Sequence, residues 1–189
     1  MTTLSVTLTN RYLPRVPEWV RDLFLIVSGS LLVALFAQIE IPLKPVPITG
    51  QTFAVLLVGA LMGAKRGGAA LGFYLVEGIA GLPFFSGGSS GSSHFFGATG
   101  GYLIGFVVAA YVTGLLAERG LERNFRTSLI PFLAGTGIIY LCGIAWLAVF
   151  LGSIQQAVIF GLLPFLLGDA IKLIAAAIAL PSAWKLLNP

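Results

Sequence analysis

The sequence predicts an all-α integral membrane protein, with six transmembrane helices in a single domain over residues 1–189. Composition is the first observation behind this prediction: 57% of the residues are hydrophobic, 10% are charged, and the mean hydropathy is +0.97. An average soluble domain is about 25% charged. A soluble fold of this length could not bury so much apolar surface, because its surface-to-volume ratio is too high. The other two observations are the length of the apolar segments and the placement of the positive charges.

Six apolar segments lie between breaks made by charges, prolines and glycines. They cover residues 22–41, 50–65, 67–83, 99–118, 128–151 and 155–186. A spanning helix needs about 20 residues, so we expect six spans and no separate soluble catalytic domain. The first segment is too long for the core of a cleavable signal peptide. The sixth contains Pro164 and Pro181, which predict a kink or a partial break.

With six spans, nearly all positive charges fall on one side of the membrane. The nine residues of that side are Arg11, Arg15, Arg21, Lys65, Arg66, Arg119, Arg123, Arg126 and Lys185. Lys44 falls on the other side, and Lys172 lies within a span. Cytoplasmic loops carry an excess of Lys and Arg, so we expect both termini in the cytoplasm. The net charge of +4 is therefore a topology signal and does not indicate nucleic-acid binding.

Two connections on the expected outer side are unusual. The first, residues 41–51, contains three prolines, so it cannot be helical and favours a stiff, extended backbone. The second, residues 81–101, has a Gly/Ser-rich centre between two pairs of phenylalanines. The centre alone fits a flexible linker, whereas the Phe pairs indicate ends that dock on the protein. We expect both loops to form a hinged lid over an outward-facing pocket, with gating positions at Pro45, Pro47, Thr49, Gly87 and Gly88.

Three ionisable residues fall within the expected spans: Glu77, Asp169 and Lys172. Such residues are costly in a bilayer and are candidates for function. Asp169 and Lys172 share a helix face, where they form either an ion pair that only orients the helix or the floor of a ligand pocket. The pair would suit a cyclic urea or amide, with Asp169 accepting from N–H and Lys172 donating to C=O or to a ligand carboxylate. Glu77 either faces the pocket or extends to the outer interface.

Polar and aromatic residues near the outer ends of the spans complete the expected site. The residues expected to bind substrate are Asp169, Lys172, Glu77, Tyr74, Gln51, Phe85 and Tyr140. The alternative for the tyrosines is a role as anchors in the interfacial aromatic belt.

Small residues at helical spacing indicate close helix contacts. The pairs are Ser30/Ala34, Gly59/Gly63, Gly68/Gly72 and Gly101/Gly105. All of them fit packing inside a compact bundle, and Ser30/Ala34 also fits docking on another membrane subunit.

Other chemistry is not indicated. The Gly-rich loop lacks the Gly-Lys-Ser/Thr ending of a phosphate-binding loop. His94 is the single histidine, so we expect no metal site and take it as an ordinary loop residue. A serine hydrolase would need His94 and a loop serine beside Asp169, which lies too deep. Cys142 lies in an apolar run, where a thiol most often serves packing. We assign no catalytic residue and no cofactor.

Five segments of the sequence carry a family likeness. They are Gln38–Leu43, Pro45–Thr52, Gly81–Phe85, Gly97–Tyr102 and Gly168–Lys172. In this order they resemble the BioY family, the biotin-binding S components of energy-coupling factor (ECF) vitamin transporters, over about residues 20–187. Ala98 differs from the proline expected in its segment, and Glu77 differs from an expected amide, which leaves the role of Glu77 open.

The resemblance implies a six-helix S-component fold with a vitamin pocket near the outer face. It implies that Asp169 and Lys172 contact the biotin rings and that the outer loops act as gates. It also implies that the chain lies in the cell membrane of a prokaryote and associates with a transmembrane T component, docked on Ser30 and Ala34, and with two cytoplasmic ATPase subunits. The sequence has no ATPase motif of its own, so ATP-driven uptake would need such partners.

We therefore expect a biotin-binding membrane subunit that works in uptake and is not an enzyme, since no nucleophile–base–orienter set is visible. Three alternatives stay open at this point. An S component for a different vitamin would keep the fold and change the pocket. A small membrane enzyme could use Asp169 or Glu77 as a base, and a solitary channel or facilitator would need no ATPase.

Overall fold

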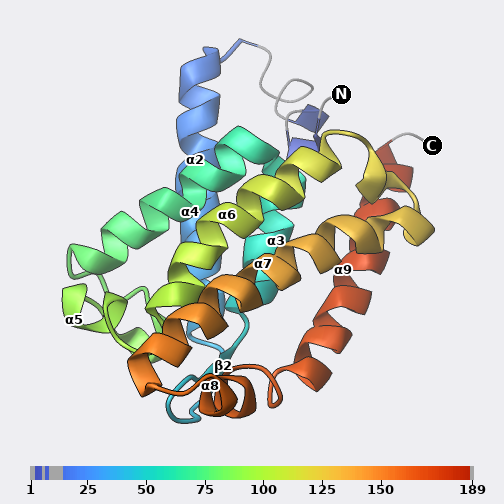
Figure 1. Cartoon of the computed structure of the whole chain (residues 1–189). Coiled ribbons are helices and arrows are strands. Elements are labelled where there is room, and N and C mark those ends of the chain that lie inside the picture. The colour runs from blue at the N-terminus through green and yellow to red at the C-terminus, as the bar shows by residue number, and fades with distance from the viewer. Residues whose placement is uncertain (1–2, 6, 9–14, 188–189) are drawn as a thin grey trace.

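The computed structural model describes residues 3–5, 7–8 and 15–187, and these form a helical bundle (Figure 1). The helices are α2 (Glu18–Ala37), α3 (Gln51–Met62), α4 (Ala64–Ile79), α5 (Ser92–Phe95), α6 (Gly100–Ala117), α7 (Phe125–Leu151), α8 (Ile154–Gly161) and α9 (Leu166–Leu187), with the 3-10 turns η1 (Ser86–Gly88) and η2 (Leu121–Arg123). The predicted all-α class is confirmed. Five of the predicted apolar segments each correspond to one helix, and the sixth is divided between α8 and α9.

Membrane-spanning length is met by some of these helices. Among the described residues, α2, α6 and α7 are long and apolar enough to cross a membrane, and α8 with α9 forms a fourth candidate that is bent by 52°. Pro164 lies in that break, as predicted, because proline lacks the N–H that would continue the helix. Pro181 lies inside α9 without ending it. The apolar helix α3 has 12 residues and α4 has 16, so the count of six spans stays a prediction.

A two-stranded ribbon replaces the irregular loop expected after the first helix. Strands β1 (Glu40–Ile41) and β2 (Ile48–Thr49) pair antiparallel, with Glu40 opposite Thr49. The three prolines lie in the turn between the strands, which is non-helical as predicted. This pairing brings the start of α3 back beside the end of α2.

The two ends of the bundle carry different segments (Figure 1). The start of α2, the α3–α4 junction, the α6–α7 connection and the last turns of α9 lie at one end, and the β-ribbon and α8 lie at the other. The positive residues predicted for one side belong to the first end, except Arg11, which lies outside the described residues. Lys44 belongs to the second end.

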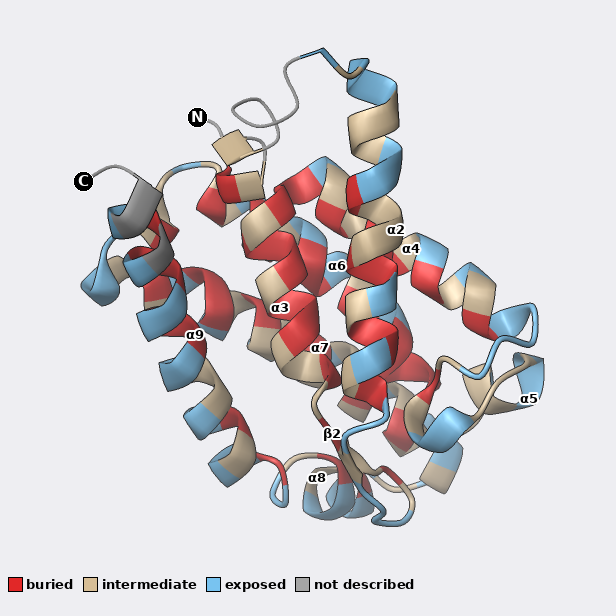
Figure 2. Cartoon of the chain, turned by 180° about the vertical axis from the view of Figure 1, so that it is seen from behind, coloured by how far each residue is buried: buried red, intermediate tan, exposed pale blue. Residues whose placement is uncertain are grey.

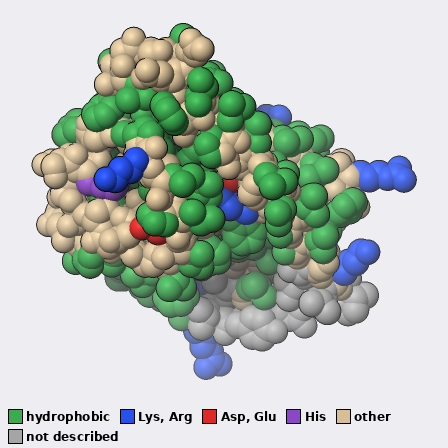
Figure 3. Space-filling view, turned by 90° about the horizontal axis from the view of Figure 1, so that it is seen from below, with side chains coloured by type: hydrophobic (Ala, Val, Ile, Leu, Met, Phe, Trp, Pro, Cys, Tyr) green, Lys and Arg blue, Asp and Glu red, His purple; other side chains and the backbone are tan. Residues whose placement is uncertain are grey.

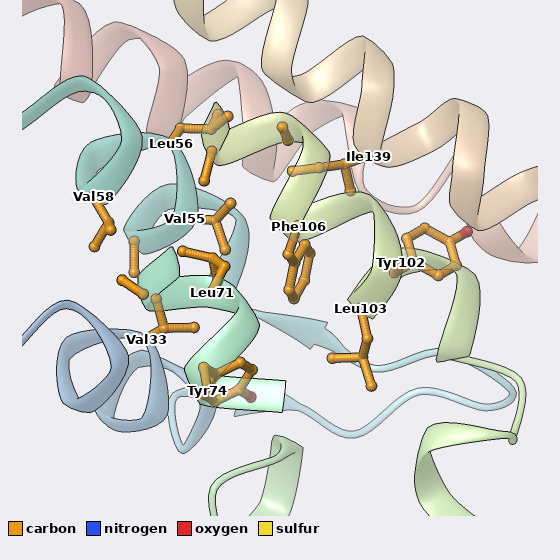
Figure 4. Packing of buried hydrophobic residues seen from close by; sticks show 14 of the residues in the cluster. Val33, Val55, Leu56, Val58, Leu71, Tyr74, Tyr102, Leu103, Phe106 and Ile139 are labelled. Atoms are coloured by element: carbon orange, nitrogen blue, oxygen red, sulfur yellow. The ribbon is translucent and has the colours of Figure 1, made fainter. Parts of the chain in front are cut away.

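The buried core lies where α2, α3, α4, α6 and α7 meet (Figures 2 and 4). Val33, Val55, Leu71, Phe106 and Ile139 each contribute from a different one of these helices and are at most 3% exposed. The outward faces of the same helices are also apolar, as is typical of helices surrounded by lipid.

Close helix contacts occur at some of the predicted small-residue pairs. A Cβ at Gly59 would lie 2.5 Å from the carbonyl oxygen of Ala110, so only glycine allows α3 to approach α6 this closely. A Cβ at Gly101 would collide with Trp146 of α7. By contrast, a Cβ at Gly72 would meet nothing within 4 Å, so the pair Gly68/Gly72 is not such a contact.

Candidate ligand-binding site

A cavity lies near the end of the bundle that holds the β-ribbon and α8, the end that Figure 3 views from below. Counting the part open to solvent, it contains about 500 Å³ of space free of protein atoms. Its apolar walls are Val46, Pro47, Tyr102, Leu103, Phe106, Ile139 and Phe165. Polar side chains line it in two sets. The first set is Thr49 of β2, Gln51 and Thr52 at the start of α3, Tyr140 in the middle of α7 and Asp169 at the start of α9. The second set is Ser86, His94 and Thr99 on the 81–101 loop.

Asp169 is the charged residue of this lining. It lies in the first turn of α9, where the positive end of the helix dipole favours an anion. Its Oδ2 accepts a 2.6 Å hydrogen bond from the Tyr140 hydroxyl, and its Oδ1 accepts bonds from Lys172 Nζ at 2.9 Å and Thr52 Oγ1 at 3.1 Å. A buried carboxylate is tolerated when it is paired and hydrogen-bonded in this way. Asp169 and Tyr140, which were both predicted to bind substrate, thus lie together in the lining of the cavity.

Lys172 lies one helical turn further along α9 and is turned away from the larger cavity. Its Nζ donates to the Thr49 carbonyl at 2.7 Å, to Thr52 Oγ1 at 2.9 Å and to Asp169 Oδ1 at 2.9 Å. These three bonds use all three of its donors. Lys172 lines a second cavity of about 220 Å³ between α3, α7 and α9. In this arrangement a bond from Lys172 to a ligand carbonyl would require it to give up one protein acceptor.

Gln51 and Tyr74 form a buried polar link beside the cavity. Gln51 is 5% exposed, lines the cavity and accepts from Thr49 Oγ1 through its Oε1. Its Nε2 donates to the Tyr74 hydroxyl at 2.7 Å, which donates in turn to the Phe84 carbonyl at 2.9 Å. Tyr74 is fully buried among the core residues (Figure 4) and does not line the cavity. Of this predicted pair, the structure places Gln51 at the cavity surface and Tyr74 one layer behind it.

The 81–101 loop is docked on the protein through its aromatic residues. Phe85 is fully buried, packs edge-on against Tyr74 with ring centroids 5.7 Å apart, and stacks on His94 at 5.2 Å. Phe84 and Phe95 also pack on the core, whereas Phe96 is 62% exposed. The prediction of docked ends holds for three of the four phenylalanines, and Phe85 supports the cavity wall from behind without lining it.

The five predicted gating positions are divided between the lining and the surface. Pro47 and Thr49 line the cavity, and Pro45 does not. Gly87 and Gly88 are exposed and have φ of +62° and +71°, which favour glycine. A gating motion of either loop stays a prediction.

Glu77 is directed away from the cavity. Its carboxylate accepts a hydrogen bond from Ser30 Oγ of α2, so it joins α4 to α2. Glu77 is absent from the lining of both cavities described above. The prediction that it contacts substrate is not supported, because its helix face is turned toward α2.

Ser30 and Ala34 are buried, at 0% and 6% exposure, on the face of α2 that packs against α4. The prediction of a docking surface at these two residues is therefore wrong for this structure. They serve the internal packing that was the alternative.

Several residues that line the cavity were not predicted from the sequence. His94 was taken as an ordinary loop residue, yet it lines the cavity, with its Nε2 3.4 Å from both Ser89 Oγ and Thr99 Oγ1. Burial lowers the pKa of His94, and the carboxylate of Glu40 partly opposes this shift. Thr52 was missed because one threonine in an apolar helix carries no signal. It lies in the first turn of α3, three residues after Thr49, which ends β2.

Comparison with known proteins finds similar sequences. A family model described as "BioY family" matches residues 3–189. The biotin transporter BioY of Thermotoga maritima is 42% identical over 147 residues, which cover 78% of this chain and 86% of that protein. The probable biotin transporter BioY of Pyrococcus horikoshii is 39% identical over 158 residues, or 84% and 93% of the two chains.

A solved structure is also similar. It is the crystal structure of the S-component for biotin from an ECF-type ABC transporter, with a TM-score of 0.74 and 26% sequence identity. The similarity covers 89% of this chain and 93% of that chain.

Proposed function

The chain belongs to the BioY family, and we propose from this premise that it is the biotin-binding membrane subunit, or S component, of an ECF-type transporter. The family is one of transporters, so the protein is a transport component and not an enzyme. The observation that carries the proposal is a largely apolar cavity with a hydrogen-bonded carboxylate, Asp169, at one end.

The proposed ligand fits this distribution of groups. Apolar walls such as Leu103 and Phe106 would hold the thiophane ring and the valeryl chain. Asp169 Oδ2 would accept a hydrogen bond from a ureido N–H, beside the Tyr140 hydroxyl. Lys172 would hold the Asp169 side chain in place, and it would reach the ureido carbonyl only by leaving the carbonyl of Thr49.

Transport needs more than this subunit. Binding alone cannot pump, because a ligand shifts an equilibrium only by its differential affinity. We propose that a transmembrane T component and two cytoplasmic ATPase subunits supply the energy for inward release. The protein would lie in the cell membrane of a prokaryote with the positively charged end of the bundle in the cytoplasm and the cavity at the outer face.

Equilibrium titration of the purified protein in detergent with biotin and a panel of other vitamins tests the ligand. We expect saturable binding of biotin and no binding of the others at comparable concentrations. Preferential binding of another vitamin would contradict the assignment of the ligand while leaving the S-component role intact.

Uptake by proteoliposomes tests the role. We expect accumulation of biotin only when the T component and ATPase subunits are reconstituted together with ATP. Accumulation or equilibration by the single chain at the same rate would contradict the proposed dependence on partners and indicate a solitary facilitator.

A further inference from the structure

A continuous series of hydrogen bonds links the charged end of the cavity to the loop that covers it. Lys172 Nζ bonds both Asp169 Oδ1 and the carbonyl of Thr49. The hydroxyl of the same Thr49 bonds Gln51 Oε1 at 3.0 Å. Gln51 Nε2 then bonds the Tyr74 hydroxyl. The series therefore passes from α9 through β2 and α3 to α4.

Tyr74 is the point where this series leaves the cavity and reaches the 81–101 loop. Its hydroxyl accepts from Gln51 Nε2 at 2.7 Å and donates to the Phe84 carbonyl at 2.9 Å. The next residue, Phe85, packs its ring edge-on against the Tyr74 ring and stacks on His94. Tyr74 thus holds the orientation of the Gln51 amide on one wall of the cavity. It also holds the position of the 81–101 loop, which forms another wall.

The neighbours of Tyr74 leave the loop little freedom at this point. Phe85 fits only because residue 78 is glycine, since a Cβ at Gly78 would collide with the Phe85 ring. Gln38 Nε2 donates to the Phe85 carbonyl at 3.3 Å from the α2 side. Of these two hydrogen bonds to the loop, the one from the Tyr74 hydroxyl is shorter than the one from Gln38. The Tyr74 hydroxyl also contacts a cavity-lining residue, Gln51.

We propose that Tyr74 is a positioning residue that never touches the ligand: its hydroxyl ties the 81–101 loop to Gln51, so that the loop stays closed over an occupied cavity. The proposal rests on the proposed function for the identity of the ligand, and it assigns to Tyr74 control of the rate of ligand release. Loss of the hydroxyl removes the tie to Phe84 and leaves the Gln51 side chain held only by the bond from Thr49 Oγ1 to its Oε1. The ligand contacts of Asp169 and Tyr140 remain.

The variant that isolates this hydroxyl is Tyr74→Phe, because it keeps the ring and its contact with Phe85. A matched control is Thr113→Val, which also removes one buried hydroxyl that donates to a carbonyl, that of Pro131 at 3.2 Å, between α6 and α7. Thr113 does not line the cavity. Any general effect of losing a buried hydrogen bond would appear in both variants.

The first measurement is hydrogen–deuterium exchange of the protein without added ligand. We expect faster exchange of the backbone amides over residues 84–91 in Tyr74→Phe and no change there in Thr113→Val. Unchanged exchange in Tyr74→Phe, or an equal increase in both variants, would overturn the proposal whatever the ligand proves to be.

The second measurement is the kinetics of biotin binding by stopped flow. For Tyr74→Phe we expect the dissociation rate to rise about tenfold, the scale of one buried hydrogen bond, with an association rate within about twofold of the wild type. A lower association rate with unchanged dissociation would contradict the assigned role. If the wild type does not bind biotin at all, the proposed function fails, and the exchange measurement alone decides the role of Tyr74.

Discussion

The Tyr140 hydroxyl lies 2.6 Å from Asp169 Oδ2, and both groups line the larger cavity. Lys172 and Thr52 occupy the other carboxylate oxygen. Each oxygen of the Asp169 carboxylate therefore has its own protein donors: Tyr140 for Oδ2, and Lys172 and Thr52 for Oδ1.

The substitution Asp169→Asn keeps the shape of this side chain and removes its charge. We expect the affinity for biotin to fall by about 5- to 150-fold, corresponding to about 1–3 kcal/mol, the scale of a hydrogen bond to a charged group. Isothermal titration of the purified variant measures it. Asp22→Asn is the control, since Asp22 pairs with Arg66 at the far end of the bundle. Equal affinities of Asp169→Asn and the wild type would remove Asp169 from the ligand contacts.

Lys172 is expected to serve stability through Asp169. Lys172→Met leaves a buried carboxylate without its cation, and breaking a buried pair from one side costs about 3–5 kcal/mol. The double variant Asp169→Asn/Lys172→Met should then be more stable than Lys172→Met alone. Thermal denaturation in one detergent, followed by tryptophan fluorescence, gives the order of the melting temperatures. Additive losses in the double variant would show that the two charges do not depend on each other.

Two glycines of comparable helical setting predict opposite effects of alanine. Gly59→Ala places a methyl group 2.5 Å from the Ala110 carbonyl and should destabilise the protein by about 1–3 kcal/mol, the cost of overpacking. At Gly137 of α7 a Cβ meets nothing within 4 Å, so Gly137→Ala should be neutral or stabilise by up to about 1 kcal/mol through helix propensity. Melting temperatures of the two variants measure both effects. A stable Gly59→Ala protein would contradict the close α3–α6 contact.

His94 predicts a dependence of stability on pH. Its folded-state pKa lies below the ordinary value of 6.5 because of burial, so the unfolded chain binds the proton more readily. The contribution of neutral His94 to stability is present above pH 6.5 and is lost as the pH falls through the lowered folded-state pKa. His94→Gln should therefore lose less stability than the wild type between about pH 7.5 and about pH 5.5. Parallel pH curves for the two proteins would show that His94 does not contribute.

The helical segments could be predicted because the length of each apolar run is visible in the sequence, and charges, prolines or glycines mark where it ends. The break at Pro164 and the shared face of Asp169 and Lys172 follow from local rules in the same way. These features need no knowledge of which helix lies next to which.

The facing of individual side chains could not be predicted, for a physical reason. Within a membrane both the protein core and the lipid are apolar, so the sequence gives little contrast between inward and outward faces. Glu77, Ser30 and Ala34 were misplaced on this account. Only the packing of α2 against α4 shows that Ser30 meets Glu77, and only the packed bundle shows that Ala34 is buried. His94 is held at the cavity by its stack on Phe85. The small and polar residues that surround His94 in the sequence do not indicate this contact.

The first turn of α2 and the last turns of α9 lie at the end of the bundle opposite the cavity (Figure 1). A fluorescent protein or an immobilisation tag fused to the N-terminus or the C-terminus would therefore not block the entry of a small molecule into the cavity. Surface-tethered protein should capture its ligand as readily as protein free in detergent.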